Sequence, residues 1–136
     1  MSSNIFEVAN LIAADPVLAT WYPEVTATPS YDFTEIARNH QCCIVPAGVE
    51  YSNVSRIQSE MTYRIEVGFM MQDSKMDLLD MITEIQDIAT AFLRKSYSDA
   101  VCVSVAHEPL YSPEEWETKS MFLSVISLKL KVMRHG

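Results

Sequence analysis

An alternating stretch at residues 60–71 constrains the fold of this chain more than any other feature. Apolar residues occupy every second position and polar or small ones lie between them: Tyr63, Ile65, Val67, Phe69 and Met71 against Thr62, Arg64, Glu66 and Gly68. This period is typical of a β-strand with one apolar and one mixed face. At about 3.3 Å per residue, the strand would extend roughly 40 Å, which is long for a small domain. We therefore expect a sheet that is covered on one side.

A helical pattern follows the strand, between about residues 75 and 95. Its apolar residues recur at intervals of three and four: Leu78, Met81, Ile82, Ile85, Ile88, Ala89 and Phe92. The opposite side carries charges: Asp77, Asp80, Glu84, Asp87 and Arg94. The pattern predicts a long amphipathic helix whose apolar side packs on the apolar face of the sheet.

The rest of the chain completes an α+β prediction. Asn4 and Glu7 have the spacing of a capping box, which predicts an N-terminal helix on the same face of the sheet. Further strands are expected at 41–45, 101–105 and 118–133, while residues 23–40 give no clear pattern. Pro46 and Gly48 end the strand at 41–45, so residues 48–59 are expected to project as a loop. With 136 residues, the chain forms one domain with a mostly antiparallel sheet.

Charge and cysteine content exclude several classes of protein. The net charge is −8, whereas nucleic acids and anionic membranes attract Lys-rich and Arg-rich surfaces. Three cysteines, two of them adjacent (Cys42, Cys43 and Cys102), do not form a disulfide framework. The N-terminus lacks the basic segment of a signal peptide, and no apolar run approaches the roughly 18 residues of a membrane span. We expect a soluble protein from a reducing compartment.

No motif predicts catalysis, a metal site or a cofactor. His40 lies near the adjacent cysteines, but this spacing differs from that of known zinc sites. Cys102 and His107 are five residues apart, which places them on opposite faces of a regular strand and outside nucleophile–base reach. The acidic pairs of the long helix lie on its solvated side, so they are not expected to face each other across a cleft. The sequence predicts a protein that is not an enzyme.

Several residues are candidates for contacts with partner subunits: Tyr51, Arg56, Glu60, Arg64, Met70, Tyr111 and Trp116. Arg56, in the expected loop, is the candidate for an intersubunit ion pair. Met70 points away from the face that carries Phe69, and methionine is common at adaptable contact surfaces. Tyr111 and Trp116 belong to a proline-containing loop; large aromatic residues often anchor interfaces, although packing of that loop on its own domain is an open alternative.

The order of these segments resembles the tail terminator, or tail-completion, proteins of long-tailed bacteriophages. The resemblance rests on the P-x-G turn of Pro46 and Gly48, on Ser55-Arg56, and on the E-x-x-Y-x-I-x-V strand beginning at Glu60. It implies a protomer without catalytic residues that assembles into a ring, typically a hexamer. Such a ring caps the tail tube, stops its elongation and joins the head. The implied partners are further copies of the chain, the tail tube protein and the head-completion (connector) protein.

The resemblance also implies a location for the protein in the virion, and it leaves other functions open. The ring would lie at the head–tail joint of a virion assembled in the host cytoplasm, away from membranes, with DNA passing through it without specific binding. The acidic side of the long helix would suit the wall of that lumen or simply a solvated outer surface. Other possibilities are a head-completion (neck) or tail-tube ring subunit, a ligand-binding α+β domain, and an enzyme whose site spans a subunit interface.

Overall fold

The computed structural model describes residues 4–21, 25–27, 40–53, 58–72, 77–119 and 121–135. They form an α+β fold, as predicted. The six-stranded sheet has the order β1-β2-β3-β6-β5-β4, with β1 parallel to β2 and all other neighbours antiparallel. The strands are β1 (Val25–Ala27), β2 (His40–Asn53), β3 (Gln58–Gln72), β4 (Ser96–Tyr97), β5 (Ala100–His107) and β6 (Met121–His135). The helices are α1 (Ile5–Ala13), the 3-10 helix η1 (Pro16–Trp21), α2 (Leu78–Phe92) and α3 (Pro113–Lys119).

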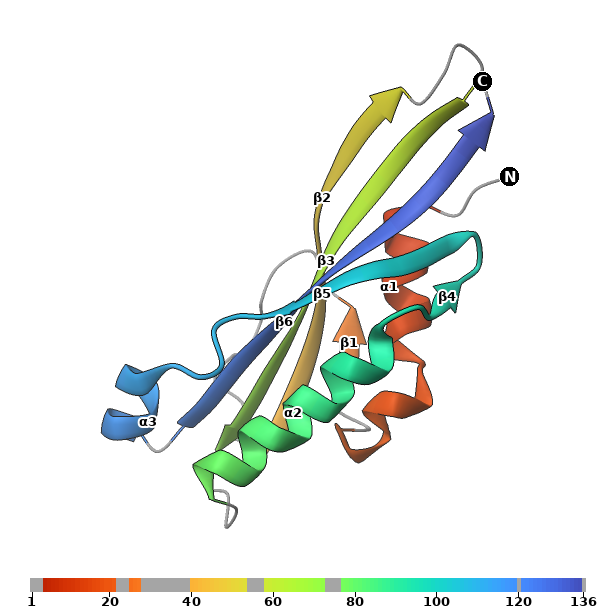
Figure 1. Ribbon diagram of the computed structural model, residues 1–136. Helices are drawn as coiled ribbons and strands as arrows, with labels where there is room; N and C mark the ends of the chain where they lie inside the picture. The colour runs from red at the N-terminus through yellow and green to blue at the C-terminus, as the bar shows by residue number, and fades with distance from the viewer. Residues whose placement is uncertain are drawn as a thin grey trace.

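The long helix and the N-terminal helix pack on the same face of the sheet (Figure 1), which confirms the predicted placement of both helices. Helix α2 buries its apolar side there, and α1 adds Val8, Ala9 and Ile12 to the same hydrophobic core. Asn4 caps α1 as expected, because its side chain accepts a hydrogen bond of 2.9 Å from the backbone N–H of Glu7. We call this helix-covered side of the sheet the inner face and the opposite side the outer face.

Strand β2 continues through Pro46 and Gly48, so the prediction that a strand ends at Pro46 is wrong. The register with β3 shifts between Pro46 and Gly48, which makes a bulge. Proline lacks a backbone N–H and is tolerated in strands at bulges and edges. The described part of β1 pairs with β2 only as far as Ile44, so Pro46 interrupts no ladder with β1.

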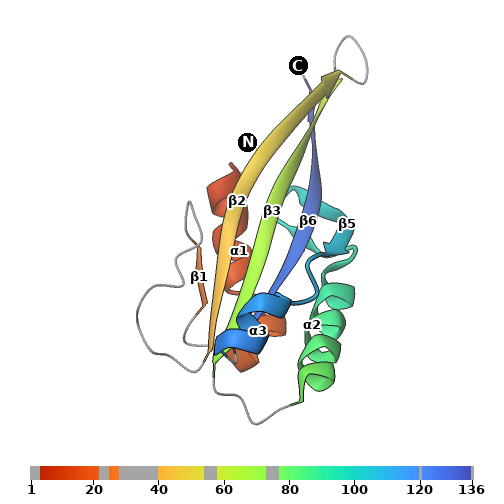
Figure 2. The ribbon, with the colours of Figure 1, turned by 90° about the vertical axis from the view of Figure 1, so that its left-hand side faces the viewer.

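The predicted loop at 48–59 is wrong for residues 48–53 and 58–59, which belong to β2 and β3. Residues 54–57, including Arg56, lie outside the described residues. The ends of β2 and β6 and the start of β3 extend together beyond the helices (Figures 1 and 2). We call this extension, residues 50–53, 58–60 and 133–135, the arm. The chain therefore projects as paired strands, in which β3 is hydrogen-bonded to β2 on one side and to β6 on the other.

A further difference lies between β5 and β6. The proline-containing loop predicted around Tyr111 and Trp116 is partly helical, because its second half forms α3, which contacts β6. Pro113 occupies the first helical position, where its missing N–H costs nothing, and the backbone N–H of Trp116 donates to the carbonyl of Ser112 at 3.0 Å. Figure 2 shows α3 in front of the lower end of the strands, with α1 behind them. Among the described residues, no helix is long and apolar enough to cross a membrane.

Candidate functional site

The structure separates the predicted contact residues. Tyr51 lies at the arm with 75% of its surface exposed. Glu60 and Arg64 occupy the outer face of β3, where Glu60 forms an ion pair of 3.3 Å with Lys131. Tyr111 and Trp116 are partly buried against the core, which favours the packing of their segment on its own domain.

Met70, which is predicted to be a contact residue, is buried within the protomer. Its side chain is only 3% exposed. Alternation does direct Met70 away from the core side of β3, but Cys43 and Val45, on the outer face of the neighbouring strand, are buried as well. The outer face is thus covered at this end, and a strand pattern alone cannot reveal such a second layer.

Farther along the strands, the outer face is open and contains a hollow of about 200 Å³ that spans β2, β3, β6 and β5. Its lining residues are Ala47, Arg64, Ile65, Glu66, Ser104, Ala106, Ser127, Leu128 and Lys129. Small residues leave space between the long side chains of Arg64, Glu66 and Lys129. Two register shifts border the hollow, at Pro46/Gly48 in β2 and at Cys102/Ser104 in β5. Bulges of this kind redirect side chains and are common beside functional sites.

Two cations face each other in this hollow. Arg64 and Lys129 are directly opposite in the β3–β6 register, and both are exposed. Like charges at directly opposite positions destabilise a strand pair. Among the side chains that the structure describes, neither cation forms an ion pair, although Glu66 lines the same hollow. The arrangement is suited to an anionic group, since guanidinium and ammonium groups bind carboxylates through charge-assisted hydrogen bonds.

Gly48 leaves room for the Arg64 side chain next to β2. A Cβ atom at position 48 would lie 3.1 Å from Nη2 of Arg64, so the absence of a side chain there leaves room for the guanidinium group. Arg64 was identified from the sequence. Lys129 is not among the predicted contact residues, because its pairing with Arg64 depends on the register of β3 and β6.

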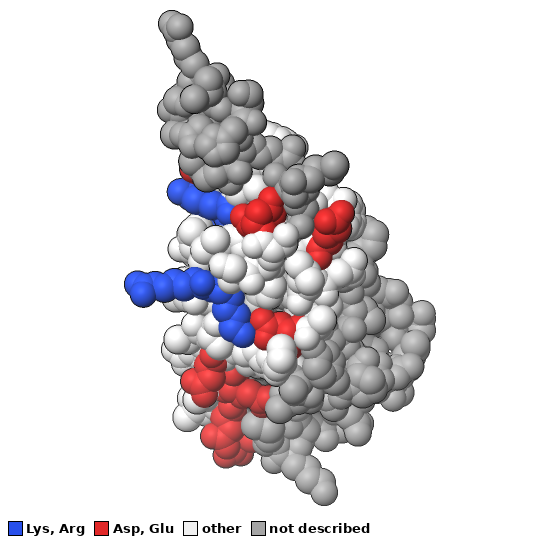
Figure 3. Space-filling view, turned by 90° about the vertical axis from the view of Figure 1, so that its right-hand side faces the viewer, with Lys and Arg blue, Asp and Glu red and all other residues white. Residues whose placement is uncertain are grey.

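The exposed side of α2 is acidic. Asp77, Asp80 and Asp87 are exposed, and Glu84 is partly exposed. Figure 3 shows acidic side chains gathered at the lower end of the molecule, where α2 begins. These carboxylates point away from the inner face, on the side of the protomer opposite to the hollow.

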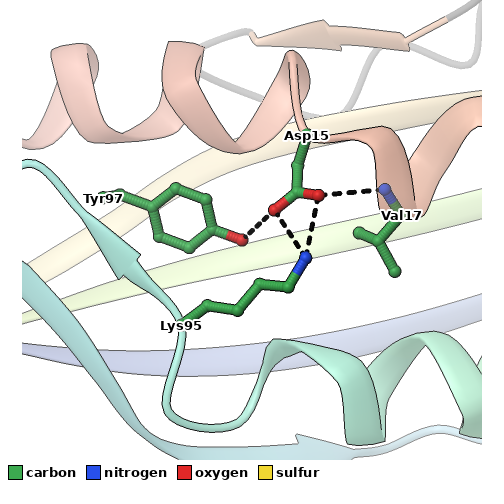
Figure 4. Close-up of polar contacts among 4 residues, drawn as sticks. All are labelled: Asp15, Val17, Lys95 and Tyr97. Carbon is green, nitrogen blue, oxygen red and sulfur yellow. Dashed lines mark hydrogen bonds and ion pairs between the residues drawn. The ribbon is translucent and has the colours of Figure 1, made fainter.

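A buried polar cluster joins η1 to the segment after α2 (Figure 4). Asp15 is 8% exposed and accepts hydrogen bonds from Tyr97 Oη at 2.6 Å, from Lys95 Nζ at 2.9 Å and from the Val17 backbone N–H at 2.9 Å. Burial by itself raises the pKa of Asp15, but these three donors together lower it below its ordinary value. Burial and the carboxylate of Asp15 raise the pKa of Tyr97. With every group engaged, the cluster is a structural feature.

Cys102 and His107 share the inner face, which contradicts the prediction of opposite faces. The register shift between Cys102 and Ser104 inserts one extra residue and reverses the alternation. His107 Nε2 lies 2.6 Å from Ser124 Oγ, while Cys102 Sγ donates to the Ser104 carbonyl at 3.7 Å. Burial raises the pKa of Cys102 and lowers that of His107. A thiol held protonated in this way is a poor nucleophile.

The adjacent cysteines do not converge on a shared site. In the β2–β3 register Cys42 pairs with Phe69 and Cys43 with Gly68, so their side chains point to opposite faces. Both are buried, and burial raises the pKa of Cys42 well above its ordinary value. The described residues contain no group of three or more potential metal ligands.

Comparison with known proteins gives a structural likeness. No protein-family model matches the sequence, and no curated protein matches it. Among solved structures, a chain from the virion of a native gene transfer agent particle aligns with 95% of this chain and 92% of its own length. The TM-score is 0.52 and the sequence identity 11%. The likeness therefore shows that the two chains share a fold over nearly their entire lengths.

Proposed function

We propose that this protein is a structural subunit of a virion. The observation that carries the proposal is the fold shared with a chain of a gene transfer agent virion, because the match covers almost all of both chains. A likeness confined to one helix and a few strands would be common among unrelated proteins. Here the match covers 95% of this chain and 92% of the other.

Within that class, we propose a tail terminator. The resemblance of Pro46–Gly48, Ser55-Arg56 and the strand beginning at Glu60 to that family supports this finer assignment. The protein would form a ring, typically a hexamer, that caps the tail tube at the head–tail joint. Its partners would be its own copies, the tail tube protein and the head-completion protein, and DNA would pass through without specific binding.

The arm supports a role in assembly. Its strands stand clear of the helices (Figure 1), and Tyr51 exposes 75% of its surface there. Tyrosine contributes a large contact area at a low cost in conformational entropy, which suits a partner surface. We assign Tyr51 and the neighbouring arm residues to contact with an adjoining subunit or the tube. A non-enzymatic role agrees with the protonated Cys102 thiol and with the structural use of Asp15, Lys95 and Tyr97.

The experiment is an elongation assay with tail tube protein of the same virion. A terminator added in small amounts should stop growth and yield short, capped tubes in electron micrographs. A tube subunit would instead be incorporated along the length, and a head-completion subunit would leave tube length unchanged. Either of these results would contradict the terminator assignment and retain a virion role.

A variant pair tests the arm. Tyr51→Asp should lose the capping activity while keeping its fold, because it places a charge in the proposed contact. Phe6→Ser removes another exposed aromatic ring, 55% exposed on α1, and should cap tubes like the wild-type protein. Equal activity of all three proteins would remove Tyr51 from the contact.

A further inference from the structure

The tail terminator role proposed above does not by itself assign a partner to the hollow of the outer face. It is lined by two cations and one carboxylate, so it carries a net positive charge in a chain whose net charge is −8. Arg64 and Lys129 oppose each other across β3 and β6 without an ion pair among the described side chains. A bound carboxylate would relieve the repulsion between them, which gives the site a preference for an anionic occupant.

We infer that this hollow is a contact site between copies of the chain and that it receives the acidic side of α2 from a neighbouring copy. The inference rests on the proposed ring. The donors are Arg64, Lys129 and the hydroxyl groups of Ser104 and Ser127, and the acceptors are the carboxylates of Asp80, Glu84 and Asp87. Asp80, Glu84 and Asp87 follow one another at helical spacings of four and three, so one helix presents them as a row.

The positions of the two surfaces favour this pairing. Helix α2 lies on the inner face, and its carboxylates point away from the sheet. The hollow lies on the outer face. Each protomer thus carries complementary surfaces on opposite sides, so one copy can engage two neighbours. Such a heterologous contact generates a ring where the rotation closes.

The small residues of the hollow fit the same occupant. Between the long side chains, the sheet carries only the short side chains of Ala47, Ala106 and Ser127. Another helix can therefore approach the sheet closely there. Apolar surface next to the hollow, at Val101 (40% exposed) and Val103 (45% exposed), would be covered in the contact. This pairing commits the acidic side of α2 to an intersubunit contact, in place of the expectation that it lines the lumen.

Charge reversal tests the contact. The sheet variant carries Arg64→Glu and Lys129→Glu, and the helix variant carries Asp80→Lys and Asp87→Lys. Each variant alone places like charges in the contact, so its association constant should fall about tenfold or more. Mixing the two variants pairs each altered surface with its complement, and the mixture should regain assembly. A single chain that carries all four changes should also regain assembly.

The helix variant distinguishes an effect of this contact on association from an effect of general repulsion between acidic chains. Its net charge is less negative than −8, so general repulsion between acidic chains would strengthen its association. The proposed contact predicts the opposite. Sedimentation velocity over a range of concentrations and salt would measure association, and circular dichroism would confirm that each variant is folded. Association of the wild-type protein should also weaken as salt increases.

Several outcomes would overturn the inference. Variants that assemble like the wild-type protein would reject this contact and leave the ring to other surfaces. A wild-type protein that stays monomeric at every concentration and salt tested would reject both the contact and the free ring. Binding of duplex DNA that is lost in the sheet variant would give the hollow a different occupant. Tube capping by the sheet variant at wild-type strength would overturn the contact while supporting the terminator assignment.

Discussion

At the scale of single residues, Asp15 shows how a buried charge is held. Its carboxylate is nearly excluded from water, and three donors converge on it: the backbone N–H of nearby Val17, and the side chains of Lys95 and Tyr97 from a segment far along the chain (Figure 4). A buried carboxylate without such partners would be strongly unfavourable. The cluster fixes the position of η1 relative to β4, and thereby the placement of α1 over the sheet.

Replacing Asp15 with Ala should lower the free energy of unfolding by about 2 kcal/mol, because it leaves the buried Tyr97 hydroxyl without its acceptor and removes hydrogen bonds to a charged group. Urea denaturation would measure the loss. Asp87→Ala on the exposed side of α2 is the matched control and should change the stability by no more than about 0.5 kcal/mol. Equal effects of the two changes would show that the cluster contributes nothing specific.

The same cluster predicts a pH dependence. The pKa of Asp15 is lower in the folded protein than its ordinary value of about 3.9. The resulting stabilisation is therefore present at neutral pH and is lost as the pH falls through the folded-state pKa. The difference in unfolding free energy between wild type and Asp15→Asn should be constant from about pH 5 to 7 and shrink below about pH 4. A difference that grew on acidification would contradict this assignment.

At the scale of elements, α2 covers the inner face over β5 and β6. It buries Met81, Ile85, Ile88, Ala89 and Phe92 along one side, and its apolar spacing repeats the helical period over its whole length. Most of the stability of such a helix comes from packing of this side, since an isolated helix of this length is marginal in water. The charged side adds solubility and the intersubunit contact proposed above.

Two substitutions on α2 compare the contribution of its buried side to stability with that of its exposed side. Ile85 is 1% exposed, so Ile85→Ala should lower the free energy of unfolding by about 3 kcal/mol through lost burial and the cavity left behind. Leu79 is an apolar residue of the same helix but 73% exposed, and Leu79→Ala should cost less than about 0.5 kcal/mol. Thermal unfolding of both variants would check the difference. A comparable loss at Leu79 would mean that another surface covers it in solution.

At the scale of the whole molecule, charge is distributed unevenly. The net charge is −8, with carboxylates along α2 and the cation pair on the outer face. This distribution suits an assembly whose subunits meet through complementary surfaces while the sum of their charges repels phosphate. DNA affinity requires cations that release counterions from the backbone, and the cations of the hollow are engaged in the proposed ring.

We expect the isolated protein to bind duplex DNA negligibly at physiological salt. A gel-shift titration would check this, with a basic DNA-binding protein as the positive control. Tight binding that persists as salt rises toward physiological concentration would contradict the expectation. An assembled ring should give the same result as the free subunit, because the hollow is then occupied by the neighbouring helix.

The sequence by itself determined the parts of the fold that depend on local periodicity. The alternation at 60–71 and the helical spacing of α2 are properties of consecutive residues, so they identify β3, α2 and the covered face without further information. Capping of α1 by Asn4 is local in the same sense. These features sufficed for the α+β class, although α3 was missed where Ser112 and Pro113 signalled a helix start.

Only the tertiary structure decided the features that depend on strand register and on the cover of the outer face. Pro46 was compatible with a strand end or a bulge, and pairing with β3 selected the bulge. One extra residue in β5 brought Cys102 and His107 to the same face. Arg64 and Lys129 oppose each other because two strands more than fifty residues apart in the chain pair in this register. Met70 is buried because the outer face is covered at its end of the sheet. Contacts between distant segments are set by the free energy of the whole packed chain, which no short window of residues contains.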